Sequence, residues 1–105
     1  MPTDNATRRQ YRAIGHKLNP VVIVSKGLSE NVLKEIGRAL DDHELIKVRV
    51  LAADREEKAA LIGEICAQTG AELIQTSGHV ALLLRRALKV KPDLSNLERY
   101  KMLLG

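Results

Sequence analysis

Lys26 and Gly27 stand between an apolar run and a segment of helical character, an arrangement that could bind an anion. Residues 21–24 are β-branched, as is typical of a buried strand. Ser29 suits a helix N-cap, and the apolar residues after it recur at helical spacing. Free backbone N–H groups, the positive end of a helix and an ammonium group together favour a phosphate; the alternative is an ordinary turn with an exposed lysine. The candidate binding residues of this loop are Ser25, Lys26, Gly27, Leu28 and Ser29.

A second set of candidates consists of basic side chains, most of which gather near the two ends of the sequence. The net charge is +4, but residues 27–80 carry more acidic than basic side chains. If the fold brings the two ends beside the loop, the cations form one basic surface; scattered solubilising charge is the alternative. The candidates of this set are Arg8, Arg12, Lys17, Lys47, Arg49, Arg85 and Arg86.

The aromatic content limits how a nucleic acid could be recognised. Tyr11 and Tyr100 are the two tyrosines, and the sequence has no Phe or Trp. Proteins that read single-stranded bases on a sheet surface stack them on aromatic side chains. The composition therefore argues against that class and leaves recognition of the backbone, through phosphates and 2′-hydroxyl groups.

No pattern of catalytic or metal-binding residues accompanies these candidates. His16, His43 and His79 are far apart and no Cys/His pair has ligand spacing, so we expect neither a metal nor a cofactor. The sequence has no nucleophile motif and no pair of catalytic carboxylates, so we expect a protein that is not an enzyme. Cys66 falls in an apolar helical pattern and is expected to be a buried structural thiol.

The apolar pattern also bears on location. The first residues are polar and basic, without the apolar stretch of a secretory signal. No apolar run approaches the roughly 20 residues that span a membrane. We therefore expect a cytoplasmic protein that does not bind a membrane and that is a monomer.

The elements that must hold these candidates follow from periodicity. Helices are expected at 7–15, from Ser29 to about His43, and from Asp54 to a terminator at Gly70. Strands are expected at 21–24, 45–51, 71–75 and 80–84, and in 45–51 apolar and basic residues alternate. The order α-β-α-β-α-β-β predicts a compact α/β domain with a four-stranded mixed sheet and helices packed on it.

A domain boundary is predicted near residue 91. Pro92 marks a break, and the apolar residues of 94–104 are only loosely periodic. Residues 1–91 are therefore expected to form one domain. Residues 92–105 are expected to be a C-terminal tail, either a short helix or disordered.

Five segments of the sequence form one pattern: HKLNP at 16–20, GLSE at 27–30, HELIKV at 43–48, DRE at 54–56 and TGA at 69–71. This pattern resembles the CRM domain (chloroplast RNA splicing and ribosome maturation), most of all its bacterial stand-alone YhbY-type form. The similarity covers about residues 8–86, and HELIKV, at the right distance after the loop and the helix, is its most specific signal. The family's loop is usually GxxG, similar to the KH-type loop that clamps a nucleic-acid backbone; here Val24 replaces the first glycine.

The resemblance implies a fold similar to the C-terminal domain of translation initiation factor three. It also implies RNA binding and association with precursors of the large ribosomal subunit, so the expected partner is ribosomal RNA or such a particle. The predicted function is ribosome maturation, in which the loop and the basic surface hold the rRNA backbone. The alternative is a protein-interaction module whose basic surface meets an acidic protein partner, motivated by the leucines of the tail and by Val24.

Overall fold

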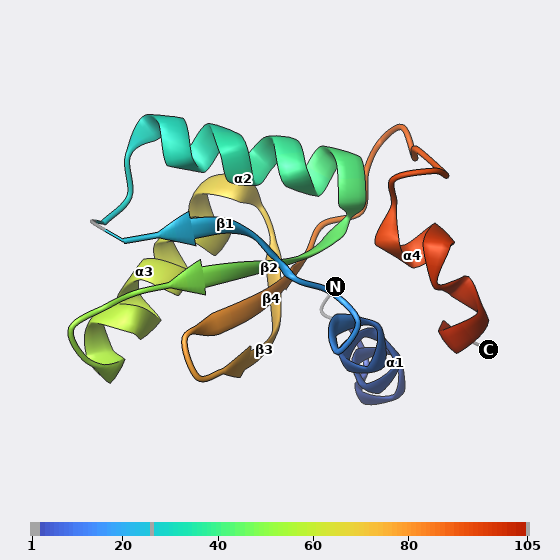
Figure 1. Ribbon diagram of the computed structural model, residues 1–105, viewed down its shortest axis with the longest axis horizontal. Helices are drawn as coiled ribbons and strands as arrows, with labels where there is room; N and C mark the ends of the chain where they lie inside the picture. The colour runs from blue at the N-terminus through green and yellow to red at the C-terminus, as the bar shows by residue number, and fades with distance from the viewer. Residues whose placement is uncertain (1–2, 26, 105) are drawn as a thin grey trace.

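The computed structural model describes residues 3–25 and 27–104, and its elements begin in the predicted order (Figure 1). The strands are β1 (Pro20–Val24), β2 (Leu45–Val50), β3 (Glu72–Ser77) and β4 (Val80–Leu84). The helices are α1 (Asn5–Gly15), α2 (Glu30–His43), α3 (Arg55–Thr69) and the short α4 (Asn96–Arg99), followed by a 3-10 turn, η1 (Lys101–Leu104). The predicted α/β fold with a four-stranded mixed sheet is confirmed.

The sheet has the strand order β1-β2-β4-β3. β1 and β2 are parallel, as a connection through the helix α2 allows, whereas β4 is antiparallel to both of its neighbours. The registers align two rows of residues that cross all four strands on the same face, because side chains alternate between the faces of a sheet. The first row is Ile23, Arg49, Val80 and Ser77, and the second is Pro20, Lys47, Leu82 and Gln75.

The helices α2 and α3 cover the other face of the sheet and form the main core with it. In Figure 1, α2 runs along the top of the sheet and α3 lies behind its left-hand end. Both helices present apolar side chains at helical spacing toward the sheet. The strand side chains that they meet in β2 are the apolar ones, as the alternation in that strand predicted. The core residues are Val22, Val24, Ile36, Leu40, Ile46, Val48, Val50, Ile62, Ile65, Ala71, Ala81 and Leu83.

The starts of the long helices are fixed by side-chain caps. The Ser29 hydroxyl accepts a hydrogen bond from the Val32 N–H at 3.1 Å and begins α2, which confirms the predicted cap. α1 begins earlier than the predicted residue 7, because Asp4 accepts from the Thr7 N–H at 2.8 Å. α3 ends at Gly70, which adopts a left-handed conformation with φ of 75° and terminates the helix, as predicted.

α1 and the C-terminal segment, residues 86–104, cover only one end of the face that carries the two rows. α1 approaches the sheet closely at Gly15, where an added Cβ would lie 2.8 Å from Leu82 Cδ2. Among the described residues, no helix covers the row through Arg49. The second apolar cluster, at the covered end, consists of Tyr11, Ile14, Leu45, Ile74, Leu82, Leu84 and Leu97.

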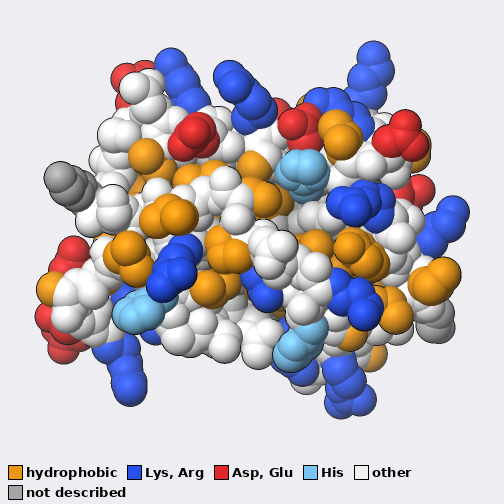
Figure 2. All heavy atoms as spheres, in the orientation of Figure 1, with side chains coloured by type: hydrophobic (Ala, Val, Ile, Leu, Met, Phe, Trp, Pro, Cys, Tyr) orange, Lys and Arg blue, Asp and Glu red, His pale blue; other side chains and the backbone are white. Residues whose placement is uncertain are grey.

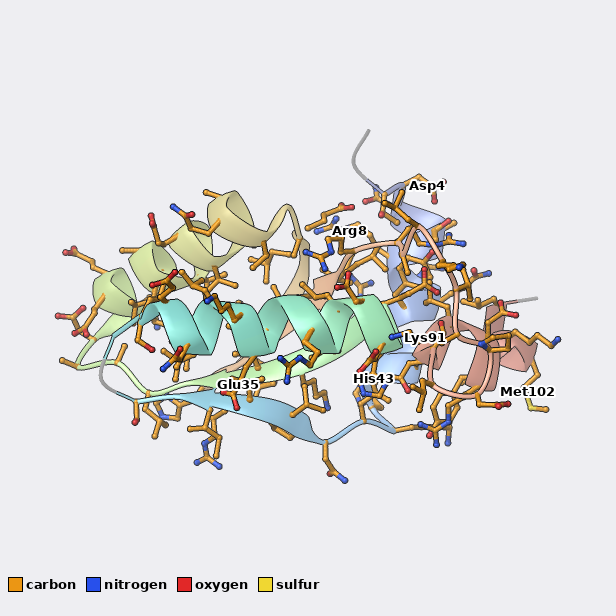
Figure 3. The ribbon with its side chains drawn as sticks, turned by 90° about the horizontal axis from the view of Figure 1, so that it is seen from above. Asp4, Arg8, Glu35, His43, Lys91 and Met102 are labelled. Carbon is orange, nitrogen blue, oxygen red and sulfur yellow. The ribbon has the colours of Figure 1, made fainter. Side chains whose placement is uncertain are left out.

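The C-terminal segment packs against the end of α2 (Figures 1 and 3). Lys91 forms an ion pair with Asp42, and this hydrogen bond holds the pKa of the Asp42 carboxyl below its ordinary value. The His43 Nδ1–H donates to the Leu94 carbonyl at 2.8 Å. Of the two alternatives predicted for the tail, the described residues contain the short helix, α4, and contacts join it to the domain across the predicted boundary at residue 91.

Glu44 fastens this segment to the corner between α2 and β2. The residue is 1% exposed, and its carboxylate accepts hydrogen bonds from Ser95 Oγ at 2.6 Å and from the Ala87 N–H at 2.7 Å. The Arg86 Nε lies 3.4 Å from the same carboxylate. The backbone of Glu44 has φ of 62° and ψ of −44°, near the positive-φ γ-turn region that strains an L-residue. The hydrogen bonds of the side chain therefore help to hold a strained corner.

Candidate nucleic-acid interface

The two rows of residues that cross the four strands, which we refer to as the open face, are largely uncovered. Leu82, in the second row, is 3% exposed beneath the end of α1. Ile23 is 59% exposed, and Val21, also on the edge strand β1, is 50% exposed. Figure 2 shows exposed hydrophobic side chains interspersed with Lys and Arg over β1 and β2, while acidic side chains lie over α2 and at the margins. The open face is therefore a mixed apolar and basic surface.

The cations of the open face are available to an anion. Lys47 and Arg49 belong to the two rows, neither of which contains an acidic residue, and Arg12 and His16 border the face from the end of α1. None of the ion pairs between described residues involves Arg12, Lys47 or Arg49. Lys47 Nζ donates to the Leu18 carbonyl at 3.2 Å, which orients the ammonium without neutralising it. The resulting positive potential favours a polyanion.

The candidate loop continues directly from the open face. β1 ends at Val24, which is paired with Val50, so the row through Ile23 and Arg49 is the one next to the loop. Val24 itself is 1% exposed and packs in the main core, so its side chain does not occupy the outer surface of the loop. The structure therefore brings the loop and Arg49 to the same end of the sheet, whereas Lys47 is level with Pro20, at the start of β1.

Within the loop, the predicted residues have different roles. Ser25 is exposed, and Gly27 has φ of 78° with open space where a Cβ would stand, a conformation that favours glycine. Leu28 packs against the main core, and the Ser29 hydroxyl is occupied as the cap of α2. Lys26 lies outside the described residues, so its part in the site remains a prediction.

Arg8 lies on the far end of α1 from the open face and is engaged within the fold. Its Nη1 donates to the Glu72 carboxylate at 2.6 Å, and its Nη2 donates to the Leu73 carbonyl at 2.8 Å, beside a register irregularity in β3. Desolvation raises the pKa of Glu72, but hydrogen bonds from Thr3 and the charge of Arg8 outweigh it and leave the pKa below its ordinary value. Arg8 therefore holds α1 against β3.

Arg85 and Arg86 lie beyond the end of β4, at the opposite end of the sheet from the loop. Arg85 donates to the Thr69 carbonyl at 2.7 Å, to the Gly37 carbonyl at 2.9 Å and to Asp41 at 2.6 Å, so it ties α2 to the end of α3. Arg86 is paired with the buried Glu44 but keeps most of its side chain exposed. The structure does not bring these two arginines together with Lys47 and Arg49.

Lys17 lies in the connection between α1 and β1 and lines a separate hollow of about 270 Å³. Arg99 and His43 line the same hollow, and the Arg99 guanidinium lies 5.5 Å from the ring centroid of Tyr100. Val21 of the edge strand also lines it, so the hollow borders the outer side of β1. Arg99 was not among the predicted residues, because the helix that carries it was assigned to a tail.

Sequence reasoning also missed the polar residues that the strand pairing adds to the open face. Gln75 and Ser77 are exposed on β3 and complete the two rows that contain Lys47 and Arg49. His16 was named as part of the HKLNP motif and rejected as a metal ligand, but it was not among the predicted binding residues, and it lies at the border of this face. The last three residues of β3 are all polar, so the sequence did not single out Gln75 and Ser77, and the strand order that places them in rows with the cations could not be read from it.

Three other kinds of chemistry concern residues 3–25 and 27–104: metal binding, a membrane crossing and a reactive thiol. In these ranges, no cluster of three or more His, Cys, Asp or Glu side chains is arranged to hold a metal ion. Of the helices described, none has both the length and the apolar character that a membrane crossing needs. Cys66 is partly buried on α3, and this burial raises the pKa of its thiol, so its reactive thiolate form is disfavoured.

Comparisons with known proteins agree with the resemblance found in the motifs. A "Probable RNA-binding protein" of Pseudomonas aeruginosa is 47% identical over 94 residues, which are 89% of this chain and 90% of that protein. An "RNA-binding protein" of Haemophilus influenzae is 44% identical over 96 residues, covering 90% of this chain and 97% of that protein.

A solved structure is similar as well. The solution structure of a hypothetical protein of Staphylococcus aureus, described as a candidate RNA-binding protein, superposes with a TM-score of 0.73 at 29% identity. The match covers 84% of this chain and 93% of that one. The profile of the CRS1 / YhbY (CRM) domain matches residues 4–85. The chain therefore belongs to the CRS1 / YhbY (CRM) domain family.

Proposed function

We propose that this chain is an RNA-binding protein that associates with precursors of the large ribosomal subunit in the cytoplasm and acts as a monomer without catalysing a reaction. The observation that carries the proposal is the open face, where Arg12, Lys47 and Arg49 surround a surface whose two rows contain no acidic residue. The names of the two bacterial relatives support it, because both are called RNA-binding proteins and match nearly along their whole length.

In this proposal the RNA backbone lies across the open face and reaches the loop. Lys47 and Arg49 neutralise phosphates and release counterions, and Ser25, Lys26 and the backbone of Gly27 contact a further phosphate near the positive end of α2. Bases are not read by stacking, because Tyr11 is buried and the open face carries no aromatic side chain. The protein thus recognises the shape and backbone of structured rRNA rather than its sequence.

The first test is sedimentation of a cell lysate on a sucrose gradient at low and at high salt. Co-migration of the protein with large-subunit particles at low salt, lost as the salt rises, is the expected result, since phosphate contacts weaken with salt. A protein that stays at the top of the gradient in both conditions would contradict the association with ribosome precursors.

The second test assigns the surface. Arg49→Glu places an acid at the centre of the open face and should weaken binding of a structured rRNA fragment and lower its salt dependence. Arg38→Glu is the matched control, because Arg38 is exposed on α2, which packs on the other face of the sheet. Equal affinities for Arg49→Glu, Arg38→Glu and the wild type would remove the open face from the proposed site.

The alternative of a protein-interaction module rested on the leucines of the tail and on Val24 in the loop. Val24 is 1% exposed and packs in the main core, so it offers no docking surface. Leu97 is 3% exposed, and Leu103 and Leu104 pack against the same apolar cluster, so these side chains are engaged within the domain. The C-terminal segment therefore gives less support to a docking role than its composition did, and RNA binding is the function that the open face favours.

A further inference from the structure

A pocket of about 100 Å³ lies where the end of α1 meets the open face. Arg12 and His16 line it from the end of α1, and Lys47 lines it from β2. Gln75 and Ser77 line it from β3, on the other side of β4. The pocket therefore has one cationic side and one side that is polar but uncharged.

The cationic side suits a phosphate. Neither Arg12 nor Lys47 has an acidic partner among the described residues, and no acidic side chain lines the pocket. The carbonyls of Arg12, Ile14 and Gly15, at the end of α1, accept hydrogen bonds from the next turn of the chain. They are therefore already paired and do not oppose an anion as free acceptors would.

The rest of the pocket suits a sugar. Its floor is made by Val80 and Leu82 of β4, which the strand register places between Lys47 and Arg49 on one side and Gln75 and Ser77 on the other. An apolar floor adds nothing to the binding of a bare ion, but it accommodates the carbon face of a ring. Gln75 and Ser77 are exposed, and their side chains make no hydrogen bond with any residue that the structure describes. Both can therefore bind a hydroxyl group, as donor or as acceptor.

We propose that this pocket holds one ribose-phosphate unit of an RNA backbone and lets the protein distinguish RNA from DNA. The phosphate lies against Arg12, His16 and Lys47, the ribose lies on the apolar floor, and the 2′-hydroxyl bonds to Gln75 or Ser77. The inference rests on the proposed function and deepens it, because it assigns one recognition step to a defined part of the open face.

The charge is tested with Arg12→Gln and its matched control Arg9→Gln, which removes the same charge from an exposed position of the same helix. The affinity for an RNA hairpin is measured over a series of salt concentrations. Loss of one phosphate contact should make the fall of log K with log salt less steep by about 0.7–0.9. At 0.1 M salt this corresponds to an RNA affinity about five- to eightfold lower than that of the wild type. Arg9→Gln should keep the slope of the wild type. Equal slopes for the two variants would overturn the phosphate assignment.

The sugar is tested with the double variant Gln75→Ala, Ser77→Ala and two hairpins of one sequence, in RNA and in DNA. The wild type should prefer RNA, and the double variant should lose about two- to tenfold in RNA affinity, the worth of one hydrogen bond, with DNA affinity unchanged. An unchanged RNA-to-DNA ratio in a variant whose amide spectrum remains that of the folded protein would overturn the proposal.

Three further outcomes separate this proposal from others. If the wild type binds RNA but none of the pocket variants changes binding, the pocket is excluded and RNA binding by the rest of the open face stands. If the wild type binds no RNA at low salt, the proposed function fails and this inference fails with it. Free ribose 5-phosphate should compete only weakly; tight binding of that compound would make the pocket a metabolite site and would overturn the RNA assignment.

Discussion

Replacing Glu44 by alanine should lower the free energy of unfolding by about 3–5 kcal/mol. The carboxylate is buried and accepts hydrogen bonds from Ser95 Oγ at 2.6 Å and from the Ala87 N–H at 2.7 Å. Hydrogen bonds to a charged group are worth about 1.5–3 kcal/mol each, and alanine would leave both donors without this partner in a buried site. Two such hydrogen bonds together are worth about 3–6 kcal/mol. Removing the buried charge offsets part of this loss, so the expected total lies in the lower part of that range.

The backbone makes a second, separable contribution. At φ of 62° an alanine keeps the strain of an L-residue, whereas a glycine does not. Glu44→Gly should therefore be more stable than Glu44→Ala by about 1 kcal/mol, although both lose the carboxylate. Glu44→Gln keeps the size and one acceptor oxygen and should lie between Glu44→Gly and the wild type.

Urea unfolding followed by circular dichroism measures these differences, and Glu35→Ala is the matched control. Glu35 is exposed on α2, so its replacement should change the free energy of unfolding by no more than about 0.5 kcal/mol. Trypsin should also cleave after Lys89 faster in Glu44→Ala, because the C-terminal segment loses its attachment. A Glu44→Ala protein within about 1 kcal/mol of the wild type, with unchanged cleavage, would refute the role given to this carboxylate.

Three further predictions concern other contacts. Glu72→Gln should lower the free energy of unfolding by about 1–3 kcal/mol at pH 7, as measured in urea. Because the folded state lowers the pKa of Glu72, the stability difference between the variant and the wild type should shrink as the pH falls below the ordinary value of 4.5. A stability difference that is equal at pH 7 and pH 3 would contradict this. Gly15→Ala should cost about 1–3 kcal/mol in the same assay, because the new Cβ lies 2.8 Å from Leu82, and unchanged stability would show that the side chain moves freely. At pH 8, Cys66 should react with an alkylating reagent more slowly in the folded than in the urea-unfolded protein, because burial raises the pKa of its thiol; equal rates would count against this.

Local features of the sequence predicted much of the open face. The alternation in β2 placed Lys47 and Arg49 opposite the core positions, and this depends only on the two-residue period of a strand. The cap at Ser29 and the end of α3 at Gly70 were likewise predicted, because a cap involves neighbours within one turn. These features need no knowledge of distant partners.

The remaining features depend on contacts between residues far apart in the sequence. Arg8 and Glu72 are separated by 64 positions, and Arg85 and Asp41 by 44, so charge alone could not show that these cations have partners within the fold. The strand order also had to be known before Gln75 could be placed in the same row as Lys47, because β4 inserts between their strands. Sequence periodicity reports which face a side chain takes, but not which strand lies beside it.

The attachment at Glu44 has a consequence for how a newly made chain becomes folded. Ala87 and Ser95 follow Glu44 by 43 and 51 residues, so at about 5–20 residues per second a ribosome completes them about 2 to 10 s after the glutamate. During that interval the corner between α2 and β2 has a strained backbone and a carboxylate without these two partners. A fragment that ended at residue 85, where the family profile ends, would contain every strand of the sheet but would keep that corner unfinished. The contacts that complete this corner therefore come from residues beyond the end of the family profile, as far along the chain as Ser95.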